Sequence, residues 1–348
     1  LSVQYQKNDR VLIPVTQLNL LQKYVSAEGK EPRIHKLGGT TWAKTKSRVQ
    51  KQVEDIADEL IELYAEREAK KGFAFSKNGS YYQEFEDAFP YSETQDQLRS
   101  IKEVSADMEK PKPMDRLVVG DVGYGKTEVA MRAAFKAVND GKQVAFLVPT
   151  TVLAQQHYES FVDRFIDFPI EIEMLSRFRT KKQADQIKTK LRKGQIDIVI
   201  GTHGLLAEGV QFQDLGLLVV DEEQRFGVKH KERIKGIKKD VDVLTLTATP
   251  IPRTLHMSLV GARDLSVIET PPANRYPVQT YVLEMNGLVI REAIERELAR
   301  GGQVFFLHNR IDSIEKRVLD IENLVPDARV AYIHGRLTQT QIENVLFE

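Results

Sequence analysis

The amino-acid sequence predicts an α/β fold, a doubly wound parallel sheet followed by the start of a second α/β domain. The first observation is an alternation of apolar runs and helix-like segments between Leu117 and Thr247, which is typical of a parallel sheet covered by helices on both faces. The second is a glycine-rich loop directly after the first run. The runs expected to form strands are Leu117–Val119, Val144–Val148, Ile172–Leu175, Ile196–Ile200, Leu215–Val220 and Val243–Thr247.

The glycine-rich loop has the pattern of a phosphate-binding loop. Residues Gly120–Thr127 read G-D-V-G-Y-G-K-T and precede a predicted helix over Glu128–Val138, the context such a loop requires. Backbone amides and the helix N-terminus favour phosphate there. We expect Lys126 to reach the β- and γ-phosphates and the Thr127 hydroxyl to bind Mg²⁺. A glycine-rich turn that binds nothing is the alternative for this loop taken alone.

Two adjacent carboxylates support the first interpretation. Asp221 and Glu222 end the apolar run Leu215–Val220, which is expected to be a buried strand. Because side chains alternate along an extended strand, Asp221 is expected to face Mg²⁺ through water while Glu222 activates the attacking water as general base. Both motifs in this order predict a nucleotide hydrolase.

Composition restricts the possible partners and surroundings. Among 348 residues, Lys plus Arg and Asp plus Glu both number 50, so any contact with nucleic acid must come from local patches. There is no cysteine, which excludes disulfides and fits a reducing cytoplasm. The apolar runs are all shorter than the roughly 20 residues of a membrane span, so we expect a soluble protein with no membrane partner.

The chain before the nucleotide motifs differs in character. Residues 1–40 mix polar and β-prone residues and are predicted to be part of a small β module. Residues 41–86 are predicted to hold a long amphipathic helix over Trp42–Ala69 and a flexible connector over Lys77–Glu86. The nucleotide-binding domain is expected to span residues 87–270.

A proline-rich linker, Thr270–Pro277, opens the last predicted domain, residues 271–348. Its pattern predicts two helices and two strands, too few strands to close a sheet of ordinary size. In chain order these elements are Gly287–Ala299, Gln303–Leu307, Ser313–Leu324 and Val330–Ile333.

Further motifs follow other predicted strands. Residues 149–156 and 201–206 should emerge at the same sheet edge as the phosphate loop, where ligands of open parallel sheets bind. Their hydroxyl and glycine residues suit phosphate contacts along nucleic acid, although ordinary helix caps explain either segment alone. Thr247–Pro250 could couple the γ-phosphate to nucleic-acid movement, and Phe89–Gln97 offers an aromatic ring and an amide for adenine.

These motifs in this order resemble the superfamily 2 helicases and translocases, and longer stretches resemble the transcription-repair coupling factors of bacteria. His35–Gly39 with Ser176–Arg179 distinguish this family from the related branched-DNA helicase RecG. The longer stretches are Met114–Phe135, Leu147–Tyr158, Glu173–Thr180, Asp221–Lys235 and Leu244–Leu259.

The resemblance implies a RecA-like motor domain 1 and an incomplete second RecA-like domain in a bacterial cytoplasmic protein, with ATP and Mg²⁺ as cofactors. It further implies a translocase on duplex DNA that binds the β subunit of stalled RNA polymerase, pushes polymerase off the lesion and recruits the excision-repair protein UvrA. The catalytic residues implied are Lys126, Thr127, Asp221 and Glu222, with Thr127 and Asp221 at Mg²⁺.

The resemblance also implies nucleotide and DNA contacts residue by residue. The nucleotide-binding positions are Phe89, Thr94, Gln97, Gly120, Asp121, Val122, Gly123, Tyr124, Gly125, Lys126, Thr127 and Glu128. The DNA-binding positions are Thr150, Gln155, Arg177, Arg179, Thr202 and His203.

Departures from the family pattern leave alternatives open. In this family the second motor domain continues past His334–Arg336 to supply an arginine finger, so we expect this chain alone to hydrolyse ATP slowly. Residue 1 is expected to lie within the polymerase-interacting module. A RecG-like branched-DNA helicase is one alternative, and residues 1–72 do not read as its wedge domain. A polymerase-binding module with an inactive ATPase is the other, against which the intact Lys126 and Glu222 argue.

Overall fold

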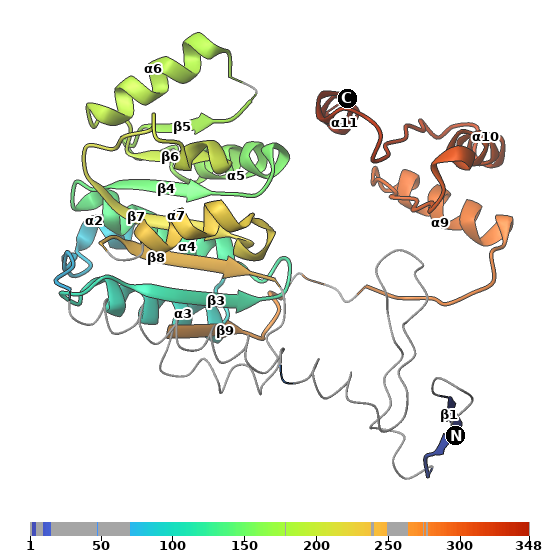
Figure 1. The fold of residues 1–348 in the computed structure, drawn as a ribbon, viewed down its shortest axis with the longest axis horizontal. Coiled ribbons are helices and arrows are strands. Elements are labelled where there is room, and N and C mark those ends of the chain that lie inside the picture. Colours follow the sequence, from blue (N-terminus) through green and yellow to red (C-terminus); the bar gives the residue numbers. More distant parts are fainter. Residues whose placement is uncertain are drawn as a thin grey trace. The chain divides into compact units, whose positions relative to one another are not determined.

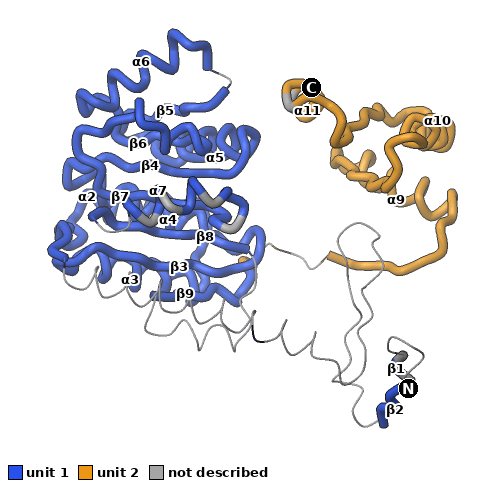
Figure 2. Tube along the Cα trace, in the orientation of Figure 1, with its two compact units in different colours: residues 1–271 blue, residues 272–348 orange. Residues whose placement is uncertain are grey.

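A computed structural model describes residues 2–4, 10–14, 47, 70–177, 179–237, 240–248, 264–273, 275 and 278–347. The chain divides into two compact units, Leu1–Pro271 and Pro272–Glu348 (Figure 2). At the N-terminus, β1 (Ser2–Gln4) pairs antiparallel with β2 (Arg10–Leu12). The helix predicted over Trp42–Ala69 and the stretch His35–Gly39 lie outside the described residues, apart from residue 47.

The first unit is built on a parallel sheet of seven strands in the order β5-β6-β4-β7-β8-β3-β9 (Figure 1). All residues of β3, β4, β6 and β8 are buried, which explains why these strands read as apolar runs. The strands are β3 (Asp115–Gly120), β4 (Gln143–Leu147), β5 (Ile172–Leu175), β6 (Ile198–Gly201), β7 (Leu215–Asp221), β8 (Asp242–Thr247) and β9 (Asp264–Ile268).

The doubly wound parallel sheet is therefore confirmed, with strands at all six predicted runs. β9 is an addition, parallel to β3 at the edge of the sheet. Its sequence, D-L-S-V-I, alternates polar and apolar residues and is only partly buried, so it lacks the continuous apolar signal of the central strands.

Helices cover the two faces of this sheet, and the alternation of side chains along each strand decides which face each residue meets. Val144 and Phe146 of β4 belong to a core shared with the first four helices, whereas Ala145 and Leu147 belong to a core shared with the last two. The helices are α2 (Ser80–Asp87), α3 (Gln95–Met108), α4 (Lys126–Asn139), α5 (Thr151–Arg164), α6 (Lys181–Arg192) and α7 (Val228–Ile237).

The predicted flexible connector over Lys77–Glu86 is wrong, because most of it forms α2. Tyr82 and Phe85 lie three residues apart on one face of this helix and are buried. The Phe85 ring stacks on Phe135 of α4 with 4.3 Å between ring centroids. Two aromatic residues at helical spacing thus outweigh the polar composition of the segment.

The second unit contains α9 (Gly287–Ala299), α10 (Ile314–Leu324) and α11 (Gln339–Phe347), with a small core that includes Ile294 and Ile321. The helices predicted over Gly287–Ala299 and Ser313–Leu324 are confirmed. The strands predicted over Gln303–Leu307 and Val330–Ile333 are wrong, since the described part of this unit has no strand. A strand exists through hydrogen bonds to a neighbouring strand, and these segments pair with none here.

One buried carboxylate lies in the core of the first unit. Asp242, at the start of β8, is 3% exposed, and its Oδ1 accepts a hydrogen bond from the Met114 amide at 2.8 Å. Its Oδ2 is buried without a hydrogen-bond partner among the described residues. Burial raises the pKa of Asp242 to about 8; the Met114 hydrogen bond opposes this shift and the nearby Asp107 charge adds to it.

The raised pKa of Asp242 predicts that stability falls with pH. The pKa is about 8 in the folded state against 3.8 without the fold, so the folded state holds the proton more tightly between these values. Unfolding free energy should therefore decrease from about pH 4 to pH 8, by about 5 kcal/mol from this group. Asp242→Asn cannot ionise and should remove that part of the slope. Denaturant unfolding of both proteins at pH 5 and pH 8 measures it, and equal slopes would contradict the assignment.

Candidate active site

The glycine-rich loop lies between the end of β3 and the start of α4 (Figure 1). Gly123 and Gly125 have φ of 79° and 84°, a left-handed conformation that glycine adopts without strain. A Cβ on Gly125 would lie 2.4 Å from Nε2 of Gln97, so the loop also needs glycine for space. Gly125 is the N-cap of α4, and no side chain caps this helix start. The first turn of α4 therefore offers backbone amides to an anion.

Charged and hydroxyl groups of the loop surround this helix start. Lys126 Nζ donates to the carbonyl oxygens of Gly120 at 2.6 Å and Asp121 at 2.9 Å. The Asp121 side chain accepts from the amide of Val122 at 2.8 Å, and Val122 itself is exposed at the loop surface. Thr127 lies in the first helical turn of α4. The ammonium group thus lies at the loop, where a phosphate would be held.

The residues predicted for adenine lie beside the loop. Thr94 caps α3, and its hydroxyl accepts from the Gln97 amide at 3.3 Å while Gln97 Oε1 accepts from the Thr94 amide at 2.8 Å. Gln97 Nε2 donates to the carbonyl of Tyr124 in the loop at 2.8 Å. Phe89 is half-buried, with its ring centroid 5.5 Å from that of Tyr91. Gln97 therefore joins the segment 89–97 to the phosphate loop.

Glu128, predicted beside the nucleotide, lies in a network of charged side chains. Its carboxylate accepts from Arg132 at 2.9 Å and from Arg164 at 2.9 and 3.1 Å. The residue is 9% exposed. The structure thus places its carboxylate among arginines of α4 and α5.

Asp221 and Glu222 lie at the carboxyl end of β7. β8 separates β7 from β3, so the ends of these two strands lie about 10 Å apart across the sheet. Glu222 has φ of 52° and ψ of 53° and is the one residue other than glycine with positive φ in the described part of the chain. Its carboxylate accepts from the Ala248 amide at 2.8 Å, and its own amide donates to the Leu246 carbonyl at 2.9 Å.

The left-handed backbone of Glu222 corrects one part of the sequence argument. Side chains of neighbouring residues point to opposite sides only in an extended strand, and β7 ends at Asp221. The direction of Glu222 is set instead by its hydrogen bonds to the end of β8. A positive φ costs a non-glycine residue about 1 kcal/mol or more, and such strain is concentrated at functional sites.

His157 is a site residue that the sequence analysis missed. It lies on α5, and its Nε2 is 3.2 Å from Oδ2 of Asp221. The imidazole also packs on Phe146, with 4.7 Å between ring centroids. The contact joins residues 64 positions apart, so only the stretch Leu147–Tyr158, which contains it, could have drawn attention to this histidine.

Few protein groups converge on one metal site here. The described residues hold no group of three or more His, Asp, Glu or Cys side chains that could bind a metal ion. Mg²⁺ is commonly held by one or two protein groups together with substrate phosphates and water. The Thr127 hydroxyl and Asp221, together with the uncapped start of α4, fit a Mg²⁺–nucleotide complex of this kind.

The predicted DNA contacts lie at the carboxyl ends of neighbouring strands β4, β6 and β5. Thr150 follows β4 and caps α5, its hydroxyl accepting from the Leu153 amide at 3.3 Å. Gln155, one turn later, donates to Glu159 at 2.6 Å. Thr202 follows β6 as the N-cap of a short 3-10 helix, η4 (His203–Leu206), and is buried. The His203 ring lies 4.9 Å from the ring of His230 on α7.

Two arginines follow β5. Arg177 is exposed, whereas Arg179 Nε donates to the Met174 carbonyl at 3.2 Å and its Nη2 lies 3.5 Å from Glu173. Because β5, β6 and β4 are neighbours, these arginines and the two loops share one half of the sheet edge. The phosphate loop and Asp221 occupy the other half, at β3 and β7.

Comparisons with known proteins agree with this geometry. The DEAD/DEAH box helicase family matches residues 94–258. The transcription-repair-coupling factor of Bacillus subtilis (strain 168) is 64% identical over 99% of this chain, which covers 29% of that protein. The coupling factor of Staphylococcus epidermidis RP62A is 60% identical over 99% of this chain, which covers 30% of it. The chain thus spans about a third of the length of these curated relatives.

Solved structures share the fold. RecG bound to a three-way DNA junction matches 86% of this chain and 41% of its own, with 36% identity and a TM-score of 0.68. The DUF1998 helicase MrfA bound to DNA matches 79% of this chain and 44% of its own with a TM-score of 0.55, and at 15% identity it supports the fold alone. No helix in the described part of the chain is long and apolar enough to cross a membrane. The chain therefore carries a RecA-like DEAD/DEAH box helicase domain, and nearly its whole length is similar to part of the transcription-repair-coupling factors.

Proposed function

We propose that this chain carries the ATP-binding half of a motor that moves along duplex DNA in transcription-coupled repair. One observation carries the proposal: β3, β8 and β7 bring the phosphate loop and the carboxylates Asp221 and Glu222 to one edge of the sheet. High identity to transcription-repair-coupling factors over nearly the whole chain supports this assignment over a RecG-like branched-DNA helicase, for which identity is lower.

In the proposed reaction the chain's residues bind ATP and activate water. Loop amides and Lys126 hold the phosphates, and Thr127 and Asp221 would hold Mg²⁺, which neutralises charge on the phosphates when bound. Glu222 accepts the proton of the attacking water as general base. Its carboxylate is already held by the Ala248 amide at 2.8 Å, which fixes its position before water arrives. Phe89 and Gln97 contact adenine.

His157 keeps the Asp221 carboxylate in place in this proposal. It lies on α5, the helix that begins after Thr150, and contacts Asp221 Oδ2 at 3.2 Å. A shift of α5 on binding DNA would therefore move a partner of the Mg²⁺ ligand. This contact provides one physical connection between the two halves of the sheet edge.

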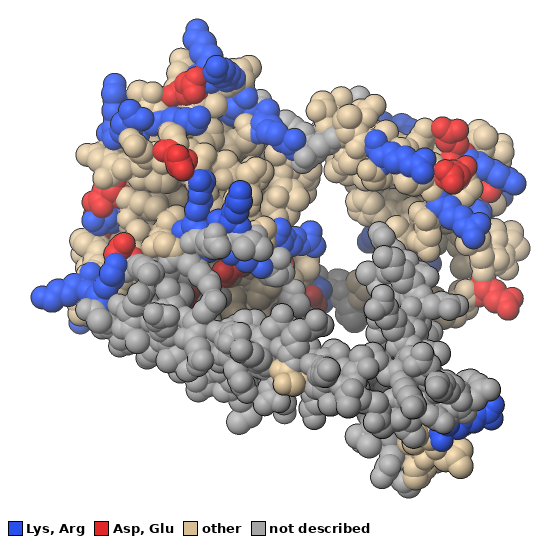
Figure 3. Space-filling view, in the orientation of Figure 1, with Lys and Arg blue, Asp and Glu red and all other residues tan. Residues whose placement is uncertain are grey.

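Duplex DNA is proposed to bind the half of the edge formed by β4, β6 and β5. Thr150, Gln155, Arg177, Thr202 and His203 contribute hydroxyl, amide and basic groups there, as suits phosphate contacts. Basic side chains continue onto α6, and Figure 3 shows Lys and Arg side chains on the surface over this helix. A concave surface beside β5 includes Arg179, Lys181, Lys182, Lys190 and Lys193.

Other parts of the proposal depend on the relatives. We assign residues 1–40 to a polymerase-interacting module, 41–86 to a linker, 87–270 to motor domain 1 and 271–348 to the start of motor domain 2. RNA polymerase, through its β subunit, and UvrA are the proposed protein partners of the intact protein in the bacterial cytoplasm. The names of the relatives support a role in coupling transcription to repair.

Lys126→Ala should weaken binding of Mg²⁺–ADP and Mg²⁺–ATP about a hundredfold, because it removes a charge-assisted contact worth about 2–3 kcal/mol. Isothermal titration calorimetry on the purified chain measures the change. Lys102→Ala, which removes an exposed lysine of α3, is the matched control and should bind as wild type. Equal nucleotide affinity in Lys126→Ala and wild type would contradict the assignment of nucleotide binding to the phosphate loop.

Arg177→Ala should weaken binding of duplex DNA without dependence on sequence. Loss of one phosphate contact should reduce the slope of log affinity against log salt concentration by about 1. Fluorescence anisotropy with two unrelated duplexes between low and moderate salt provides the measurement. Arg10→Ala, an exposed arginine of β2, serves as control. An unchanged salt dependence of affinity in Arg177→Ala would contradict a contact between Arg177 and a DNA phosphate.

A further inference from the structure

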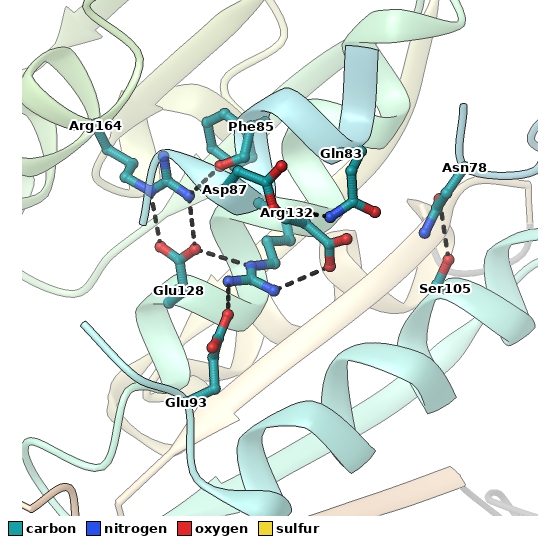
Figure 4. A network of polar contacts seen from close by, with 10 residues as sticks. Asn78, Gln83, Phe85, Asp87, Glu93, Ser105, Glu128, Arg132 and Arg164 are labelled. Atoms are coloured by element: carbon teal, nitrogen blue, oxygen red, sulfur yellow. Dashed lines mark hydrogen bonds and ion pairs between the residues drawn. The ribbon is translucent and has the colours of Figure 1, made fainter. Parts of the chain in front are cut away.

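A buried arginine lies at the centre of a charged cluster that no step of the proposed mechanism uses. Arg132 lies on α4, and its side chain is 1% exposed. Its Nε donates to Glu128 at 2.9 Å, its Nη1 to Glu86 at 3.0 Å and its Nη2 to Glu93. Figure 4 shows the guanidinium between carboxylates from three separate segments. Each of its three nitrogens therefore donates to a carboxylate side chain.

A second arginine completes this cluster. Arg164, at the end of α5, donates to Glu128 through both Nε and Nη2 and to the Phe85 carbonyl at 2.7 Å. The guanidinium carbons of Arg132 and Arg164 each lie 5.5 Å from the centroid of the Phe89 ring. At that distance a cation over the face of an aromatic ring is attracted by the negative charge density of that face. Phe89 is therefore held by two cations from different helices.

The charges in the cluster are mutually dependent. Burial would raise the pKa of Glu93, but hydrogen bonds from Arg132 and a backbone amide, with the charges of Arg132 and Arg164, hold it below its ordinary value. Burial likewise opposes the charge of Arg132, and its hydrogen bonds to Glu128 and Glu93 outweigh that effect, so its pKa is raised. Removing one partner leaves a buried charge without compensation, which is costly.

The contacts of the cluster connect α4 with the segment proposed to contact adenine. Glu86 lies just before the segment 89–97 proposed to contact adenine, Phe89 begins that segment, and Glu93 lies within it, directly before Thr94, the cap of α3. Arg132 therefore contacts the beginning and the middle of that segment. The Arg132 side chain projects from α4, the helix that follows the phosphate loop. The base-contacting segment is thus fixed to the same helix whose N-terminus faces the phosphates.

Two independent connections set the distance between base and phosphates. One is the hydrogen bond from Gln97 Nε2 to the Tyr124 carbonyl, at 2.8 Å. The other is the Arg132 cluster, which acts on residues 86–93. A ligand that has both a base and phosphates needs both regions in register, whereas a ligand with phosphates alone needs only the loop.

We propose that Arg132 is a positioning residue that sets selectivity for the adenine base by holding residues 89–97 in register with the phosphate loop. The inference rests on the nucleotide site proposed above. A purely structural role for the cluster would lower stability and weaken all phosphate ligands alike. A positioning role weakens ligands that carry the base and spares those that lack it.

The test compares three ligands, each with Mg²⁺: ADP, GDP and inorganic tripolyphosphate, which has no base. Glu93→Gln keeps an acceptor for Arg132 Nη2 but loses the charge, and its side chain is 23% exposed, so the variant should fold. We expect ADP affinity to fall about tenfold and the ADP-to-GDP ratio to fall with it. Tripolyphosphate affinity should stay within about twofold, since the loop is unchanged.

Two further variants complete the comparison. Glu84→Gln removes an exposed carboxylate of α2 outside the cluster and should match wild type for all three ligands. Arg132→Lys keeps the charge but cannot donate to three carboxylates in one plane, so its loss of ADP affinity should exceed that of Glu93→Gln. If Arg132→Lys does not fold, the ligand affinities of Glu93→Gln alone test the positioning role.

The outcomes separate the inference from the function on which it rests. Equal loss for ADP and tripolyphosphate, or unchanged ADP selectivity in Glu93→Gln, would overturn the positioning role. Wild-type protein that binds tripolyphosphate but shows no preference for ADP over GDP would also overturn the positioning role. That result would still support phosphate binding by the loop. Wild-type protein that binds neither ADP nor tripolyphosphate would overturn the proposed nucleotide site and the inference with it.

Discussion

The parallel direction of all seven strands is the constraint on which the rest of the molecule depends. It brings the carboxyl end of each strand to one edge, where loops from distant parts of the sequence meet. The phosphate loop, Thr150, Thr202 and Asp221 share this edge, although about a hundred residues separate the beginning of the loop from Asp221. Burial of the strands on both faces fixes their register and hence the site.

Rigid contacts between helices and loops then refine what the sheet provides. Glu222 is held in a left-handed conformation by hydrogen bonds to the end of β8, and Gln97 is fixed between the cap of α3 and the phosphate loop. The Arg132 cluster connects α2, α4 and α5 around Phe89. The guanidinium groups of Arg132 and Arg164 are buried, and the lower effective dielectric there strengthens their contacts.

The sequence predicts the parts of this molecule that depend on local pattern. Central strands are continuous apolar runs because both faces are covered, and the phosphate loop has a spacing that its chemistry requires. The same local reasoning fails where distant partners decide. α2 forms because Tyr82 and Phe85 reach Phe135, and His157 and Arg132 matter through residues far away in the chain. Gln303–Leu307 reads as a strand, yet it has no strand beside it among the described residues.

The central claim is that nucleotide and duplex DNA occupy two halves of one sheet edge. Amide hydrogen exchange with Mg²⁺–ADP and, separately, with duplex DNA tests both halves in one measurement. The account predicts slower exchange at residues 121–127 with nucleotide and at residues 150–156, 176–180 and 202–206 with DNA. Nucleotide that leaves residues 121–127 unchanged, or DNA that protects only segments away from this edge, would contradict it.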